Sequence, residues 1–74
     1  MRIISQNGAI DLPYDSCLVW ICDKEIMAQP IRKPNNYTFA YYSTQEVAEY
    51  AMRLLHKACV RHRDLFQFPK EEYL

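Results

Sequence analysis

The sequence predicts one α+β domain, in which a small antiparallel sheet of four to six short strands packs against one helix in the C-terminal half. Residues 1–42 alternate short apolar segments with turn signals, and residues 43–62 carry apolar side chains at helical spacing. The 74-residue chain is 50% hydrophobic and has one glycine, a composition typical of a folded globule. We expect a short strand at 63–68 and a tail at 69–74.

The first element is a hairpin. In "MRIISQNGAIDLPYD", two apolar segments flank Asn7 and Gly8, the dipeptide that best supplies the positive φ angles of a two-residue type I′ turn. Pro13 should end the second strand, because proline cannot donate a hydrogen bond to a sheet.

Three further strands are expected before the helix. Cys17–Cys22 ("CLVWIC") is apolar on both faces, which is typical of a strand covered on both sides. Glu25–Pro30 forms a weaker strand, and residues 31–36 form a polar loop. Tyr37–Tyr42 is rich in the aromatic and β-branched residues that favour a pleated sheet.

The helix begins at "STQE". Ser43 as N-cap with Glu46 three residues later forms a capping box. Glu49 and Arg53 are spaced for an ion pair on the exposed side, and the helix should run to about His62. The expected apolar stripe consists of Val47, Ala51, Leu54, Leu55 and Ala58. "LFQFP" alternates like a last strand, and "KEEYL" is expected to be a loose tail.

One helix cannot cover a five-stranded sheet of any length. If the uncovered face carries Trp20 or the tyrosines, it forms an apolar patch. We therefore expect a homo-oligomer, most simply a twofold dimer.

Composition also limits the class of partner. Nine basic and nine acidic residues cancel, which disfavours nucleic acid as a partner. The three cysteines are odd in number, and we see no secretory leader or membrane segment, so we expect a cytoplasmic protein without a membrane partner.

The segment "LLHKACVRHRD" is the most suggestive for a site. His56, Cys59 and His62 lie three residues apart, but no cysteine pair or HExxH pattern accompanies them, so we expect neither a metal site nor a cofactor. No catalytic motif is present either, and the protein is not expected to be an enzyme.

Cationic side chains in this segment favour an anion site. Arg53, Lys57 and Arg61 recur every four residues along one ridge, and guanidinium groups offer paired donors to phosphate. His56 flanks the ridge, and Arg32 with Lys33 can approach from the proline loop. A solvated charged helix face explains the same pattern.

Aromatic side chains are the second component of this hypothesis. A nucleobase would stack on an aromatic ring beside the cations, and the candidates are Trp20, Tyr37, Tyr41 and Tyr42. Tyr41 and Tyr42 should point to opposite faces of their strand. Packing in a core or a dimer interface is the alternative role for these rings.

The opening "MRIISQNGAIDLPYD" and the segment "YYSTQEVAEYAMRLLHKA" resemble a family of short proteins of Firmicutes and their phages and prophages. The resemblance covers a little under half of the chain and transfers no activity to any residue. It implies a phage context, in which small proteins often act against host defence by binding an immune protein or sequestering its nucleotide signal.

Together these observations predict a non-enzymatic binding protein. Its expected partner is a small anionic ligand, a signalling nucleotide, held in an oligomer. The alternative is an inhibitor or adaptor that contacts a host defence protein through an aromatic face.

Overall fold

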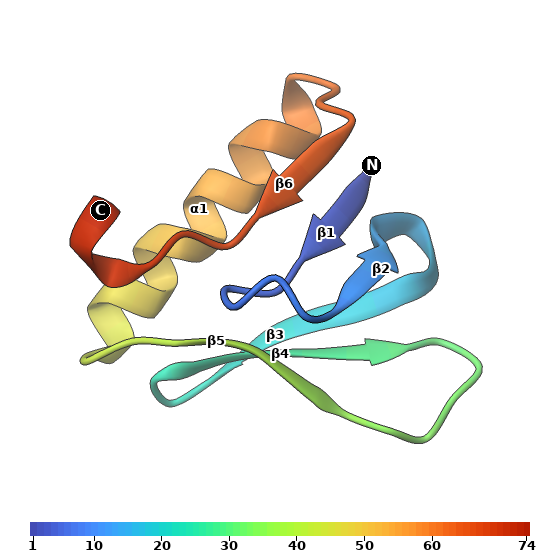
Figure 1. Cartoon of the computed structure of the whole chain (residues 1–74), viewed down its shortest axis with the longest axis horizontal. Helices are drawn as coiled ribbons and strands as arrows, with labels where there is room; N and C mark the ends of the chain where they lie inside the picture. The colour runs from blue at the N-terminus through green and yellow to red at the C-terminus, as the bar shows by residue number, and fades with distance from the viewer.

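The computed structural model describes all 74 residues and confirms the α+β class, with its helix in the C-terminal half (Figure 1). The chain is built from six strands, one α-helix and two short 3-10 turns. The elements in chain order are β1 (Arg2–Ile4), β2 (Asp11–Pro13), η1 (Tyr14–Ser16), β3 (Cys17–Cys22), β4 (Glu25–Pro30), β5 (Tyr37–Tyr41), α1 (Gln45–Val60), β6 (Leu65–Gln67) and η2 (Glu71–Tyr73).

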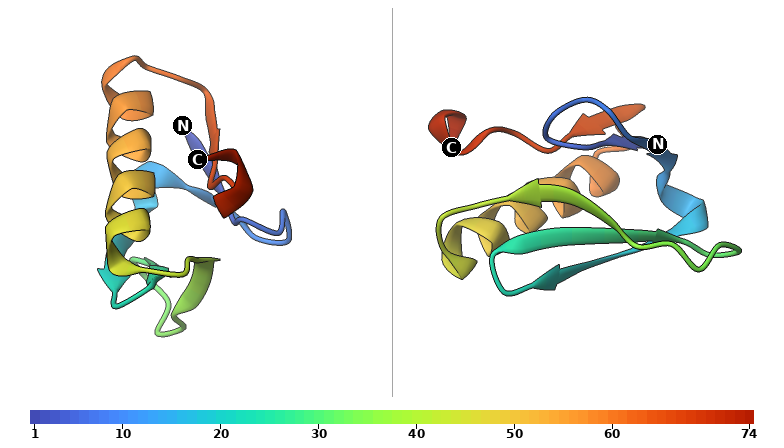
Figure 2. Two further views of the ribbon diagram at one scale, coloured as in Figure 1. Left: turned by 90° about the vertical axis from the view of Figure 1, so that its left-hand side faces the viewer. Right: turned by 60° about the horizontal axis from the view of Figure 1, so that its bottom comes forward.

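The strands form two sheets, where the sequence led us to expect one antiparallel sheet. The first sheet has the order β2-β1-β6, and its β1–β6 pair is parallel; the second has the order β3-β4-β5 and is antiparallel throughout. The helix lies along one side of both sheets and contacts β3, β4 and β6 (Figure 2). The parallel pair is possible because α1 carries the chain back before β6 begins.

The hairpin of β1 and β2 is present, and β2 ends at Pro13 as expected. The prediction of a two-residue type I′ turn is wrong. The loop spans residues 5–10, and Gly8 is its only residue with a positive φ, of 78°. The buried Ser5 hydroxyl donates to Asn7 Oδ1 at 2.7 Å, and the Gly8 N–H donates to the Ser5 carbonyl at 2.9 Å. These local hydrogen bonds stabilise a wider loop than the Asn-Gly dipeptide predicts.

Strand β3 is not covered on both sides. It is an edge strand without a fully buried residue, and the Leu18 side chain is 57% exposed. The helix and the first sheet lie against one face only, so the side chains of Val19 and Ile21 pack on the core while the alternate face stays open.

A β-bulge in β5 enlarges the core. Ile26 pairs with Ala40 and Met27 pairs with Thr38, so that Phe39 is an extra residue in the ladder. Consecutive strand residues normally point to opposite faces, yet Phe39 and Ala40 are both buried. The bulge turns both side chains toward the core.

The helix starts one residue later than the capping box predicts. Thr44 is the N-cap, and its hydroxyl accepts a hydrogen bond from the Val47 N–H at 3.2 Å. Ser43 instead donates to the Glu71 carboxylate through its hydroxyl and its backbone N–H. Glu46 therefore lies in the first turn without a capping partner.

The helix ends in a Schellman motif. His62 has a φ of 55°, and its N–H donates to the Cys59 carbonyl at 3.1 Å. The Arg63 N–H donates to the Ala58 carbonyl at 3.0 Å. This double hydrogen bond satisfies the last carbonyls and turns the chain toward β6.

The exposed side of the helix differs from the expected pattern. Glu49 and Arg53 form no ion pair; the Arg53 guanidinium lies over the Tyr50 ring, 5.7 Å from its centroid. The structure's one ion pair joins Arg2 to Asp11 at 2.9 Å. The buried stripe of the helix is Ala48, Ala51, Leu55 and Ala58.

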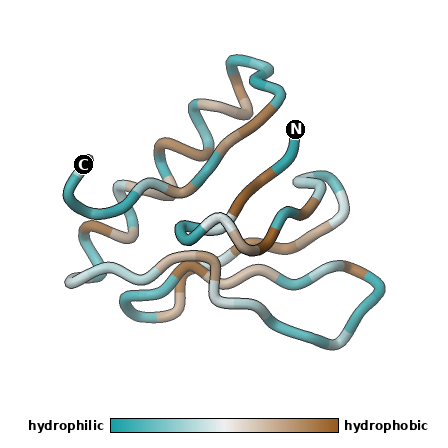
Figure 3. The backbone as a smooth tube through the Cα atoms, viewed as in Figure 1, coloured by the Kyte–Doolittle hydropathy of each residue, from teal (hydrophilic) through white to brown (hydrophobic).

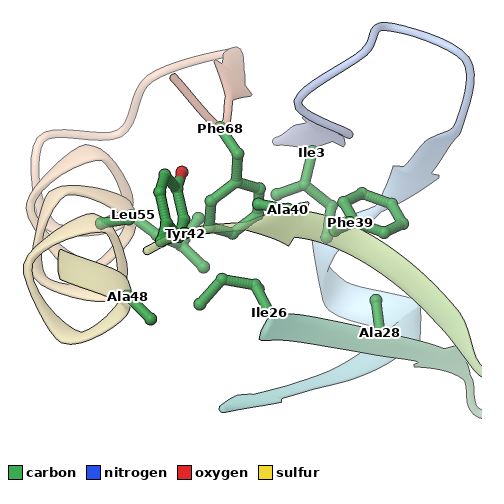
Figure 4. Packing of buried hydrophobic residues seen from close by; sticks show 10 residues of the cluster. Ile3, Ile26, Ala28, Phe39, Ala40, Tyr42, Ala48, Leu55 and Phe68 are labelled. Atoms are coloured by element: carbon green, nitrogen blue, oxygen red, sulfur yellow. The ribbon is translucent and has the colours of Figure 1, made fainter. Parts of the chain in front are cut away.

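One hydrophobic core is shared by the helix and both sheets (Figure 4). Phe68, which follows β6, is near its centre, and its ring makes edge-to-face contacts with Phe39 at 6.2 Å and Phe66 at 5.1 Å. Small side chains on the helix allow it to approach the strands closely. The fully packed residues are Ile3, Ile26, Ala28, Phe39, Ala40, Tyr42, Ala48, Ala51, Leu55 and Phe68.

Gln6 connects the two sheets. Its backbone N–H donates to the Phe39 carbonyl at 2.6 Å, and its Oε1 accepts from the Tyr41 N–H at 3.1 Å. Its Nε2 donates to the Pro69 carbonyl at 3.1 Å. Gln6 therefore joins the first loop to the outer edge of β5 and, separately, to the C-terminal segment.

The expected loose tail is held to the core. The Tyr42 hydroxyl donates to the Pro69 carbonyl at 2.8 Å, and the Glu71 carboxylate accepts from the Ser43 N–H at 2.7 Å. Burial, with a further contribution from the Glu71 carboxylate, raises the pKa of Tyr42 to about 12. The hydroxyl therefore stays protonated and able to donate at neutral pH.

We predict that Gln6→Ala lowers the free energy of unfolding by about 1–3 kcal/mol, because it removes the side-chain hydrogen bonds to Tyr41 of the second sheet and to Pro69 after β6. The matched control Gln45→Ala, at an exposed position that makes no side-chain hydrogen bond, should change it by less than about 0.5 kcal/mol. Urea unfolding followed by circular dichroism measures both. Equal effects of the two changes would refute the role of Gln6.

We also predict a pH dependence from Glu71. The hydrogen bonds from Ser43 hold the pKa of this carboxyl below its ordinary value of 4.5. The stabilisation is thus fully present above pH 4.5 and is lost as the pH falls through the lower folded pKa. A carboxyl titration by NMR should give a midpoint below 4.5 that returns toward 4.5 in Ser43→Ala; a wild-type midpoint at or above 4.5 would contradict the contact.

Candidate functional site

A groove lies between the two sheets. Its volume is about 670 Å³, which is within the range of small-molecule sites. Ile10, strand β2 and the end of η1 form one wall, and the other comes from the end of β4, the following loop and the start of β5. The lining residues are Ile10, Leu12, Pro13, Ser16, Pro30, Ile31, Arg32, Lys33 and Tyr37.

The groove combines apolar surface with positive charge. Ile31 is a large hydrophobic residue that is nevertheless 60% exposed, and it lies beside the cations Arg32 and Lys33. No acidic side chain lines the groove. The Tyr37 ring is half-buried against the core and leaves part of its surface to the cavity. This arrangement suits a ligand with an apolar, planar part and an anionic group.

The loop that carries the cations has a fixed conformation at its start. The Lys33 N–H donates to the Pro30 carbonyl at 3.1 Å, and the Gln29 side-chain amide donates to the Lys33 carbonyl at 3.1 Å. These bonds close a tight turn, so the two basic side chains leave the sheet at the rim of the groove.

The predicted cationic ridge is separate from this groove. Lys57 and Arg61 line a second hollow of about 340 Å³, together with Arg63. Arg53 is outside it, packed over Tyr50, and His56 is exposed and lines neither cavity. The structure thus divides the sequence-predicted cations into two sets on different elements. Figure 3 shows the polar stretches at the helix end and in the loop between β4 and β5 as distinct segments.

The aromatic candidates are divided as well. Tyr37 lines the groove, whereas Trp20 lies on the outer face of the second sheet, where Tyr41 is 60% exposed. Tyr42 is fully buried, and its hydroxyl donates a hydrogen bond to the Pro69 carbonyl. Tyr41 and Tyr42 do point to opposite faces, and Tyr42 is a core residue and not a ligand contact.

Titratable side chains do not assemble into a reactive cluster. The structure contains no group of three or more His, Cys, Asp or Glu residues placed to hold a metal ion. All three cysteines are free thiols. Burial, followed by the Asp15 carboxylate, raises the pKa of Cys17, which keeps this thiol protonated at neutral pH.

Sequence reasoning missed the apolar walls of the groove. Leu12 and Ile31 are distant in the chain and come together only because β2 of the first sheet lies across the groove from the end of β4 in the second. Pro13 and Pro30, at the ends of their strands, are the one local signal, since proline often marks where a strand edge opens into a loop.

Comparison with family models, curated proteins and solved structures finds no match for this chain. The resemblance of its opening segment to short phage proteins therefore stays a prediction. The structure has no helix with the length and apolar character needed to cross a membrane.

The contrasting positions of the two adjacent tyrosines give a test. Tyr42→Phe should lower the free energy of unfolding by about 1 kcal/mol, because the hydrogen bond to the Pro69 carbonyl is lost. Tyr41→Phe is the matched control and should change it by less than about 0.5 kcal/mol. Thermal and urea unfolding measure both changes in free energy. A larger loss in Tyr41→Phe than in Tyr42→Phe would contradict the assignment of Tyr42 to the core.

Proposed function

We propose that this protein is a non-enzymatic, phage-type counter-defence factor that sequesters a small anionic ligand, a signalling nucleotide, in a bacterial cytoplasm. The groove between the sheets is the proposed binding site, and the protein acts as a homo-oligomer. The observation that supports this proposal is one cavity of about 670 Å³ with an apolar wall, an aromatic ring and two cations at its rim.

Each component of a nucleotide has a counterpart in the groove. A base would stack on Tyr37 and contact Ile31, since aromatic rings and apolar side chains accept any base by its face. Phosphate oxygens would accept hydrogen bonds from Arg32 and Lys33. The absence of acidic lining residues leaves the local potential positive although the chain is neutral overall.

A second candidate function is binding of a host protein. It is favoured by the open face of the second sheet, which carries Trp20 and on which Leu18 and Tyr41 are more than half exposed. Exposed aromatic and aliphatic side chains on a rigid sheet are typical of interface cores. In this case the protein would act as an inhibitor or adaptor.

Two double charge reversals distinguish the possible anion sites. Arg32→Glu with Lys33→Glu changes the groove, and Arg53→Glu with Lys57→Glu changes the ridge by the same net charge. All four side chains are exposed and none is in an ion pair, so both variants should fold. The groove variant should lose at least about tenfold in affinity, because a hydrogen bond to a charged group contributes about 1.5–3 kcal/mol. The ridge variant should stay within about threefold of the wild type, because charges far from the ligand are screened by salt.

Native mass spectrometry with a panel of cyclic and ADP-ribose-type nucleotides is the measurement. A ligand adduct that is retained by the ridge variant and lost by the groove variant supports the groove. The opposite result would move the site to the ridge. Absence of binding to the whole panel would contradict the nucleotide proposal, and affinity capture from host lysate would then test the protein partner.

A further inference from the structure

Three of the four sheet edges in this fold are blocked or short. Strands β2 and β6 have three residues each, and β2 ends in Pro13. The edge of β5 is occupied by Gln6, which bonds to Phe39 and Tyr41. These are the ways in which natural proteins prevent unwanted strand pairing.

The edge of β3 has none of these protections. The strand has six residues, Cys17–Cys22, without a charge, a proline or a bulge. Figure 2 (right) shows it at the margin of the molecule, with no segment beyond it. An exposed apolar edge of this length is a template for another strand.

The register identifies the groups that point outward. The Ile31 N–H donates to the Ser16 carbonyl, and this pair continues the β3–β4 register in which Cys17 faces Pro30. In an antiparallel pair, hydrogen-bonded residues alternate along the strand. Residues 18, 20 and 22 therefore direct their backbone groups to β4, and Cys17, Val19 and Ile21 direct theirs outward. No hydrogen bond from another segment reaches these outward groups.

We infer that β3 pairs antiparallel with β3 of a second copy of this chain, about a twofold axis at Val19, to form a continuous six-stranded sheet. Antiparallel pairing of a strand with itself is self-complementary, as an isologous interface requires. With the axis at Val19, the outward groups of Cys17 meet those of Ile21 in the second copy. All three outward residues of each chain are then hydrogen-bonded.

Side chains agree with this register. On the open face, Leu18 of one copy lies opposite Trp20 of the other, an aliphatic–aromatic pair of the kind that stabilises adjacent strands. No charged residue lies within the paired segment, so no like charges meet. An uncharged strand therefore suits this edge, and β3 of a second copy is such a strand.

The dimer also bears on the groove. Ser16, one of the groove residues, lies opposite Cys22 of the second copy in this register, so each groove opens beside the dimer interface. The inference supplies the interface of the oligomer in the proposed function. It does not require a ligand, and the two can fail separately.

Light scattering coupled to size-exclusion chromatography tests the pairing. The wild type should have twice the 8.8 kDa mass of the chain. Leu18→Lys changes a residue that is already 57% exposed, and Val19→Pro removes an outward N–H without breaking the bonds to β4; both should give monomers. The matched control Val60→Lys, at a 77% exposed position on the helix, should remain dimeric.

Circular dichroism must show that each monomeric variant is folded. If Val19→Pro unfolds, Leu18→Lys alone tests the pairing. A wild-type monomer up to millimolar concentration, or a dimer that survives in folded Leu18→Lys, would overturn the inference. If the wild type is a monomer, the edge of β3 is free to pair with a strand of another protein.

Cysteine cross-linking tests the register itself. In a background in which the native cysteines are replaced by serine, Leu18→Cys and Trp20→Cys should cross-link when the two variants are mixed and not when either is alone. The reason is that positions 18 and 20 oppose each other in a closely spaced pair. Cross-linking of Trp20→Cys alone, or none in the mixture, would refute the axis at Val19. Native mass spectrometry measures the subunit number and the bound ligand separately. A dimer that binds no ligand would therefore contradict the proposed function and leave the inferred pairing standing.

Discussion

The hydrogen bonds of Gln6 are the constraint on which the arrangement of the two sheets depends. One side chain and its backbone N–H bond to β5 on two sides of Ala40 and to the segment after β6. The loop that carries Gln6 also contributes Ile10 to the groove between the sheets. The Gln6 contact closes the edge of β5, which leaves β3 as the open edge. One loop therefore adjoins the proposed ligand site and, by occupying the edge of β5, leaves β3 as the edge of the proposed dimer interface.

The core explains why so small a chain can support two sheets. A domain of this size buries little surface, and its strands are too short to form a stable sandwich alone. Alanines on the buried side of α1 bring the helix close to β4, while Phe68 and Tyr42 fill the space between the sheets. The bulge at Phe39 adds a second aromatic ring to this space. One face of the second sheet stays uncovered as a result. Pairing with a second copy would extend this sheet, and a host protein could bind its open face.

The site was predictable in its chemistry and only partly in its position. Arg32, Lys33 and Tyr37 come together in the groove, because they flank one loop and the turn after β4 fixes its start. Arg53, Lys57 and Arg61 do have the predicted spacing along α1. Arg53 nevertheless packs on Tyr50, and the Schellman turn directs the chain after α1 away from the helix axis. Spacing along a helix predicts which side chains share a face; it carries no information on which cavity that face meets.

Local pattern by itself determined the elements of this protein. Proline ended β2, alternation placed Tyr41 and Tyr42 on opposite faces, and the helical period located α1 to within about two residues. Tertiary structure decided the rest: the helix cap moved to Thr44 because Ser43 bonds to Glu71, and six strands divided into two sheets because β6 returns parallel to β1. These outcomes depend on contacts between residues far apart in the chain. Neither propensity nor periodicity records such contacts, and the groove and the open edge are made of them.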